Sequence, residues 1–222
     1  MKRTLIACAM VEDEIKKIYE TTGCRIPVVW VERGYHRSPQ ELRKKLQALI
    51  DGLQDQDEIL LTFGLCGNGT AGLVSRHATL VLPRFDDCVN MLLCRSRRKT
   101  RGLTETGSIY LTRAWTQDSE AILAQHDNYI ATYGQEAAEE ILKTMYGNYE
   151  KIAVIDTGCY ELTATQNYAQ EAAKRLDLST ETVAGSTRML EKLLGGQWDE
   201  NFIVKRPGEP LDIREWELPG EE

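Results

Sequence analysis

The sequence has no long apolar run, no excess of positive charge and no pair of cysteines separated by two residues. A membrane-spanning helix needs about 20 apolar residues, so none is expected. A formal net charge of -7 argues against a nucleic-acid partner, because phosphate binding needs a basic face. The first apolar stretch reaches acidic residues at Glu12, too early for a signal peptide. We therefore expect a cytoplasmic protein with neither a membrane nor a nucleic-acid partner.

The composition is that of an ordinary folded protein. Of its 222 residues, 42% are apolar, enough to bury a continuous core. We expect a single α/β domain over residues 1–222, with lobes 1–114 and 115–222 as an alternative. The six cysteines are predicted to be reduced thiols, because a chain of this length without a secretory signal has little need of disulfides.

Apolar runs alternate with amphipathic stretches, which predicts a parallel sheet covered by helices on both faces. Strands are predicted at 4–9, 26–31, 58–63, 78–82, 108–111, 151–155 and 180–183. Helices are predicted at 11–21, 39–53, 87–94, 118–147 in two pieces, 164–176 and 187–194. Ser38 is expected to cap the helix that begins at Pro39. The fold class is a Rossmann-like, mostly parallel α/β fold whose later units extend the sheet or form a second lobe.

Three cysteines stand where such a fold places reactive groups. Cys8 closes the first strand, Cys66 lies in the glycine-rich loop after the third, and Cys88 follows the fourth. The carboxyl ends of parallel strands share one edge of the sheet, so three thiols there could reach one metal ion. His36, after the second strand, is the candidate fourth ligand or proton carrier. From the spacing alone, ordinary buried cysteines are the more frequent explanation.

Polar groups beside these cysteines suggest further roles. Asp87 and Arg84 are candidate catalytic residues, although an aspartate before a helix is more often a cap and an arginine there is usually an ion-pair partner. Gly67, Asn68 and Gly69 are a candidate cofactor-binding loop, because glycines let backbone amides turn toward a ligand. With Gly72 they have dinucleotide-motif spacing. Nucleotide binding ranks lower, because the loop does not follow the first strand.

Longer phrases carry a family resemblance. The chain resembles domain-of-unknown-function family 1638 in three motifs: Gly64-Leu65-Cys66-Gly67-Asn68-Gly69, Pro83-Arg84-Phe85-Asp86-Asp87-Cys88 and Ile155-Asp156-Thr157-Gly158. The resemblance extends to Cys8, Glu14 and Gly34-Tyr35-His36. It implies an association with corrinoid-dependent methyl transfer in anaerobic bacteria and archaea and leaves the reaction open. It also favours a shared thiol site, because its phrases contain Cys66 and Cys88.

The expected function is that of a metal-binding protein with zinc held by Cys8, Cys66 and Cys88 and a fourth position filled by His36 or open to a small-molecule substrate. A zinc-dependent methyl or group transferase is the candidate activity, with a corrinoid protein or a methyltransferase as partner. The alternatives are an iron-sulfur protein, a nucleotide-binding protein and a non-catalytic accessory protein of a methyltransferase system.

Overall fold

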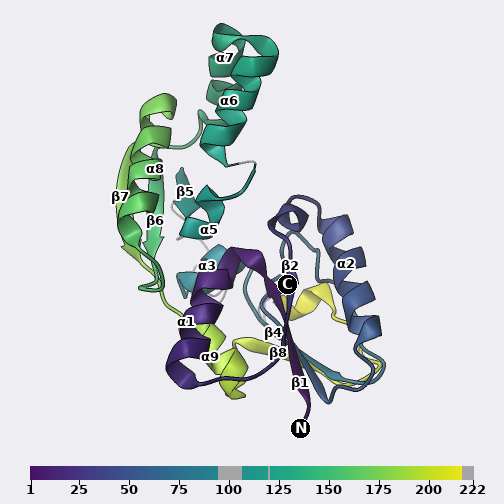
Figure 1. The fold of residues 1–222 in the computed structure, drawn as a ribbon. Helices are drawn as coiled ribbons and strands as arrows, with labels where there is room; N and C mark the ends of the chain where they lie inside the picture. Colours follow the sequence, from purple (N-terminus) through teal and green to yellow (C-terminus); the bar gives the residue numbers. More distant parts are fainter. Residues whose placement is uncertain (95–106, 120, 217–222) are drawn as a thin grey trace. The chain divides into compact units, whose positions relative to one another are not determined.

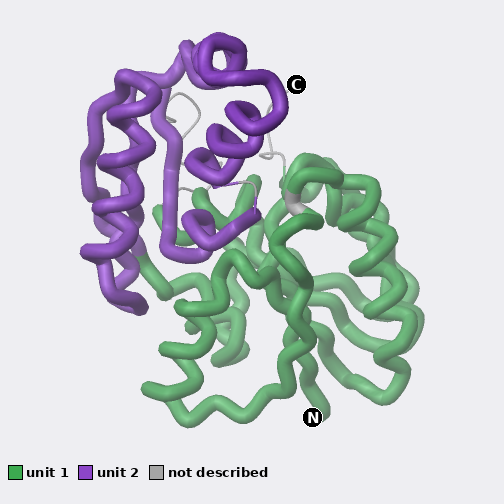
Figure 2. Tube along the Cα trace, turned by 45° about the horizontal axis from the view of Figure 1, so that its top comes forward, with its two compact units in different colours: residues 1–101, 186–222 green, residues 102–185 purple. Residues whose placement is uncertain are grey.

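A computed structural model describes residues 1–94, 107–119 and 121–216, without the side chain of His36. The chain divides into two compact units, coloured separately in Figure 2. Unit 1 comprises Met1–Arg101 and Ser186–Glu222, and unit 2 comprises Gly102–Gly185. Unit 2 is thus an insertion in the sequence of unit 1. The units divide before β5 (Ser108–Leu111), which pairs with residues 151–154 of unit 2, whereas the alternative lobes were expected to divide after residue 114.

Unit 1 contains a five-stranded sheet in the order β2-β1-β3-β4-β8. Its strands are β1 (Arg3–Cys8), β2 (Val28–Val31), β3 (Glu58–Leu61), β4 (Thr79–Pro83) and β8 (Phe202–Lys205). The first four are parallel, and β8 pairs antiparallel with β4. Because β1 has β2 on one side and β3 on the other, the direction of winding reverses at β1.

Helices cover both faces of this sheet. The 3-10 turn η1 (Ala9–Val11) and α1 (Glu12–Thr22) connect β1 to β2, and η2 (Arg33–Arg37) and α2 (Pro39–Gly52) connect β2 to β3. The two crossovers run in opposite directions, so right-handed connections place α1 and α2 on opposite faces, as Figure 1 shows. The remaining helical segments of unit 1 are α3 (Cys88–Leu92), α9 (Arg188–Gly195) and η3 (Ile213–Trp216).

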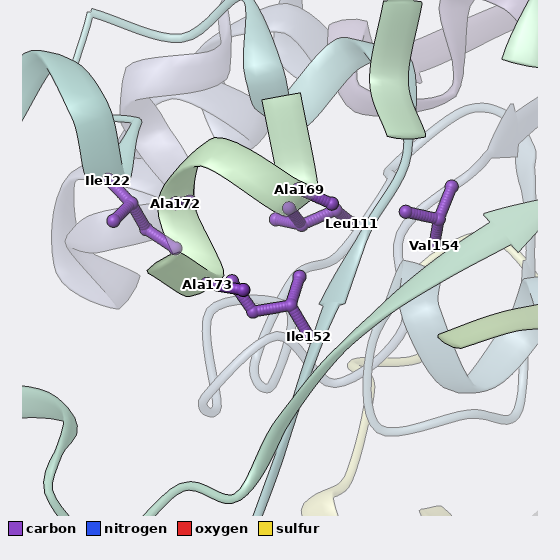
Figure 3. Packing of buried hydrophobic residues seen from close by; sticks show 7 residues of the cluster. All are labelled: Leu111, Ile122, Ile152, Val154, Ala169, Ala172 and Ala173. Carbon is purple, nitrogen blue, oxygen red and sulfur yellow. The ribbon is translucent and has the colours of Figure 1, made fainter. Parts of the chain in front are cut away.

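Unit 2 has its own three-stranded parallel sheet, β5-β6-β7. Its other elements are α5 (Arg113–Thr116), α6 (Ile122–Tyr133), α7 (Gln135–Tyr146), β6 (Lys151–Asp156), α8 (Leu162–Leu176) and β7 (Ser179–Ala184). Figure 3 shows its core, in which small alanines of α8 allow the helix to approach apolar side chains of β5, β6 and α6. The core residues are Leu111, Ile122, Ile152, Val154, Ala169, Ala172 and Ala173.

The mixed α/β fold with mostly parallel strands confirms the predicted class. Ser38 caps α2 as expected, its hydroxyl accepting a hydrogen bond from the Glu41 amide at 3.4 Å. The helix predicted over 87–94 ends at Leu92, because Cys94 adopts a left-handed backbone with φ 51°. The strand β8 and the 3-10 turn η3 with its buried Trp216 were not predicted.

Among the described residues, no helix combines the length and apolar character needed to span a bilayer. The expected cytoplasmic location stays a prediction.

Leu60 tests the core of unit 1. Its side chain in β3 is 0% exposed. We expect Leu60→Ala to reduce the free energy of unfolding by about 2–5 kcal/mol, because it leaves a cavity between packed layers. In the same sheet Val204 is 46% exposed, so Val204→Ala should change stability by less than about 0.5 kcal/mol. Urea denaturation of both variants checks this, and equal losses would contradict the assigned core.

Candidate functional site at the carboxyl edge of the unit 1 sheet

The three predicted thiols lie at the end of three neighbouring strands. Cys8 is the last residue of β1, Cys66 follows β3, and Cys88 begins α3 after β4. The winding reversal lies between β1 and β3, and in open α/β sheets ligands bind outside the carboxyl ends of the strands at such a point. The thiols therefore lie where this topology places a ligand.

β1 and β3 separate as they reach this edge. Their pairing ends with Ile6 opposite Leu61. Beyond it, the Thr62 hydroxyl accepts a hydrogen bond from the Cys8 amide at 2.9 Å, so a side chain replaces the main-chain partner. Thr62 thus holds the end of β1 through its hydroxyl and also through its own amide, which donates to the Ile6 carbonyl at 3.2 Å.

The chain after β3 turns toward the chain after β4. The amides of Leu65 and Cys66 donate hydrogen bonds to the carbonyls of Phe85 and Asp86, at 2.8 and 2.7 Å. A Cβ atom at Gly64 would lie 2.3 Å from the Phe85 carbonyl oxygen, so this approach requires glycine. These contacts bring the loop of Cys66 next to the loop that leads into Cys88.

The Cys66 loop has a strained backbone. Cys66, Gly67 and Asn68 all have positive φ, at 48°, 63° and 73°. A residue other than glycine in this region costs on the order of 1–3 kcal/mol, and such residues cluster at functional sites. The strain at Cys66 thus supports a role for its side chain beyond packing.

The glycines of this loop have a packing explanation. A Cβ at Gly67 would lie 3.1 Å from Cγ of Pro39, and a Cβ at Gly69 would lie 2.9 Å from Cδ2 of Leu42. The loop therefore lies against the first turn of α2, and its glycines are needed whether or not a ligand binds. Cofactor binding by Gly67, Asn68 and Gly69 stays a prediction.

Cys8 is buried, and Cys66 and Cys88 are partly exposed, yet all three thiols are poorly solvated. Burial raises the pKa of the Cys8 thiol to about 11, although a hydrogen bond from the Met10 backbone and the positive charge of Arg33 oppose the rise. Burial raises the pKa of Cys66 to about 12, and the neighbouring Cys8 and Asp87 add to the effect. Both thiols are therefore protonated at neutral pH unless a cation stabilises the thiolate.

Cys88 shares this environment. Its pKa is raised well above the usual range by burial, and then by four neighbouring acidic groups, Cys8, Asp87, Cys66 and Glu14. Ionisation of any one of the three thiols therefore disfavours ionisation of the others.

Two charged residues of this edge lie close to the thiols. Glu14, in the first turn of α1, is 1% exposed. Arg33 begins η2, two residues after Val31, which pairs with Cys8. The sequence pointed to Glu14 only through the family resemblance. Arg33 was not predicted as a site residue, although its position directly after the second strand could have indicated it.

The other predicted site residues have different placements. Asp87 caps α3, its carboxylate accepting a hydrogen bond from the Asn90 amide at 2.8 Å, and burial raises its pKa. Arg84 donates to the backbone carbonyls of Phe202 and Glu215, which ties β4 to the C-terminal segment. The His36 side chain lies outside the described residues, although its backbone belongs to η2. Asp87 thus begins the helix that carries Cys88, Arg84 joins β4 to the C-terminal segment, and a catalytic role for either residue stays a prediction.

The side chains as they stand do not form a finished metal site. All six cysteines are free thiols. Within residues 1–94, 107–119 and 121–216, no three cysteine, histidine, aspartate or glutamate side chains are grouped closely enough to hold one ion. Ligation by the three thiols would therefore require rotation of their side chains.

Unit 2 has a pocket of about 590 Å³ between α6, α7 and α8. It lies where α7 and α8 end, and hence near the amino ends of β6 and β7. Arg175 in its lining is ion-paired with Asp127 at 2.9 Å and with Glu171 at 3.1 Å. Its position and its paired charge make it a weaker candidate than the thiol edge.

A family described as "Protein of unknown function (DUF1638)" matches residues 30–194. The matched range contains Cys66 and Cys88 and begins after Cys8 and Glu14. Neither the curated proteins nor the solved structures provided a match.

A substitution at Gly64 tests the close approach between the loop of Cys66 and the loop that leads into Cys88. Gly64→Ala places a methyl group against the Phe85 carbonyl and should cost about 1–3 kcal/mol in unfolding free energy while moving Cys66 away from Cys88. Gly52→Ala is the control, because a Cβ there meets nothing within 4 Å. Chemical denaturation measures the first effect. A stable Gly64→Ala variant would contradict the close approach.

The thiols also predict a pH dependence. Folding raises the pKa of Cys8 to about 11 and of Cys66 to about 12, from 9.0, so the folded state retains protons that the unfolded chain releases. This contribution to stability is fully present below pH 9 and is lost as pH rises toward 11–12. Each thiol adds a slope of up to about 1.4 kcal/mol per pH unit. In urea denaturation of metal-free protein between pH 8 and 10.5, Cys8→Ala should lose stability less steeply than wild type; equal slopes would refute this.

Proposed function

For this chain, a member of the DUF1638 family, we propose a metal-binding function in which Cys8, Cys66 and Cys88 hold a thiophilic ion, best matched by zinc. The observation that carries the proposal is the position of the three cysteines at the carboxyl ends of three adjacent parallel strands, beside the winding reversal. This is the edge at which open α/β sheets bind their ligands.

The backbone around the thiols supports the proposal. Three local features position them. The Thr62 hydroxyl accepts a hydrogen bond from the Cys8 amide, the backbone at Gly64 approaches the Phe85 carbonyl, and Cys66 has a left-handed backbone. Functional groups held on rigid elements by such contacts are typical of organised sites.

The donor set fits zinc in its chemistry. Thiolates are preferred zinc ligands, and an ion would compensate the burial and, after it, the neighbouring negative charges that keep the thiols protonated. Because the ion must displace protons, its affinity should rise with pH, by up to about tenfold per pH unit for each proton released. The three cysteines follow neighbouring strands, and completion of the site would require their side chains to move toward one another.

Zinc bound by thiolates would supply Lewis-acid activation of an incoming thiol, with a fourth position filled by a protein group or open to substrate. The residues of this chain would orient the ligands and exclude water. The family resemblance adds methyl-group transfer linked to a corrinoid protein or a methyltransferase as the proposed context. Catalytic and accessory roles both follow from that context.

Elemental analysis after anaerobic purification tests metal binding. We expect near-stoichiometric zinc in the wild type and loss of most of it in Cys8→Ser, Cys66→Ser and Cys88→Ser, because each removes one ligand. Cys159→Ser is the matched control, since Cys159 lies in unit 2 and its thiol donates to the Thr157 carbonyl at 3.4 Å.

The same measurement separates the alternatives. Iron and sulfide in place of zinc, lost in the same three variants, would assign an iron-sulfur cluster to the site. The proposal is rejected if the wild-type protein contains no metal and takes up neither zinc nor iron when supplied with them. Nucleotide binding would then be the leading alternative.

A further inference from the structure

Unit 2 contains a cavity that the thiol site does not use. The pocket between α6, α7 and α8 has a volume of about 590 Å³. Small-molecule sites typically have about 300–1,000 Å³. Its lining belongs wholly to unit 2 and combines hydrogen-bonding groups with apolar and aromatic side chains, namely Leu142, Tyr146, Tyr149, Leu176 and Leu178. The pocket therefore offers a ring-sized ligand both kinds of contact.

His126 brings a hydrogen-bond donor to this pocket. The residue lines the pocket although it is only 7% exposed. Its Nδ1 lies 2.8 Å from Nη1 of Arg175. A guanidinium group can only donate, so Nδ1 accepts, the ring is neutral and its proton is on Nε2. Among the described residues none pairs with this Nε2–H, which leaves a donor unused at the pocket wall.

Arg175 is held in place by carboxylates outside the lining. It forms ion pairs with Asp127 at 2.9 Å and with Glu171 at 3.1 Å. These two carboxylates compensate the charge of the guanidinium. Arg175 is therefore a positioning residue, which fixes the tautomer of His126 and adds little attraction for an anion.

The remaining charges of the pocket cancel. The lining contains two further cations and two carboxylates: Lys143, Lys174, Glu139 and Asp177. In addition, α7 and α8 both end at the pocket, and the carboxyl end of a helix disfavours anions. A cationic ligand would instead meet the two lysines. The electrostatics therefore favour an uncharged ligand.

Two tyrosines give the pocket an aromatic wall. The ring centroids of Tyr146 and Tyr149 lie 6.1 Å apart, and the rings are tilted by 51°. Tyr146 is held by a hydrogen bond from its hydroxyl to Gln125 at 3.3 Å. Tyr149 is 39% exposed, so part of its side chain is left uncovered. Aromatic side chains of this kind pack well against flat rings, in offset or edge-to-face arrangements.

We propose that this pocket binds an uncharged, planar heteroaromatic molecule. Its ring packs against Tyr149, and a ring nitrogen or carbonyl oxygen accepts the hydrogen bond from Nε2 of His126. The inference goes beyond the proposed metal-binding function and is independent of it, because the pocket lies in unit 2 and the three thiols lie in unit 1.

Three forms of one ring test the ligand class. Nicotinamide is neutral, nicotinate is the corresponding anion, and nicotinamide methylated on its ring nitrogen is the corresponding cation. In an NMR titration of the full chain that follows backbone amides, nicotinamide should shift the amides of pocket residues with a Kd of about 1–10 mM, as expected for so small a ligand. The two charged forms should bind at least about tenfold more weakly, because nothing in the pocket compensates their charge.

Two variants test the assigned contacts. Tyr149→Ala removes the exposed ring and should weaken nicotinamide binding about threefold to tenfold. His126→Phe keeps a ring but removes the donor, and should weaken binding about fivefold. Tyr133→Ala is the matched control, since Tyr133 is 61% exposed, lies in the same pair of helices and is not part of the lining. It should bind nicotinamide as the wild type does.

Each outcome decides the proposal. It is overturned if no pocket amide shifts with nicotinamide at concentrations up to about 50 mM, well above the expected Kd. Tighter binding of either charged form would overturn the uncharged class. Wild-type affinity in Tyr149→Ala, or an equal loss in Tyr133→Ala, would overturn the assigned position. If His126→Phe does not fold, Tyr149→Ala still decides the question, because that substitution lies at the surface.

Discussion

The reversal of winding at β1 is the constraint on which the rest of unit 1 depends. Right-handed crossovers place α1 on one face and α2 on the other only because β2 and β3 lie on opposite sides of β1. The same arrangement makes the chain segments leave the edge in different directions. Cys8 is held by the Thr62 hydroxyl, and the segment after β3 turns to the segment after β4. The thiol site is therefore a product of topology first and of local sequence second.

Much of the fold was accessible from the sequence because the deciding signals were local. Buried parallel strands such as β3 are short apolar runs, and the start of α2 has Ser38, Pro39 and Glu41 in their capping positions. The strand β8 could not be found in this way. It is four residues long, and in the sequence all of unit 2 lies between it and its partner β4. Its stability therefore comes from pairing between distant segments of the chain. The end of α3 depends on one left-handed residue, Cys94, which no helix pattern anticipates.

The candidate site was only partly predictable. The cysteines could be found because strand ends and loops are recognisable, and parallel strands share an edge. Glu14 was different, since three acidic residues at a helix start all look like a solvated first turn, and only the packing of α1 shows that Asp13 and Glu14 are buried while Glu12 is not. Gly67 and Gly69 gave the opposite difficulty. Their spacing suggests a ligand, whereas their contacts with Pro39 and Leu42 show tight packing on α2.

The insertion of unit 2 also affects the order in which the protein is made. On the ribosome, β4 emerges long before its neighbour β8, with roughly 120 residues between them, which at about 5–20 residues per second takes on the order of 6–24 s. During that interval the outer edge of β4 has no strand beside it, and the carbonyls that receive Arg84 have not been synthesised. The nascent chain thus carries an open sheet edge throughout this interval, and an open edge can pair with the wrong strand.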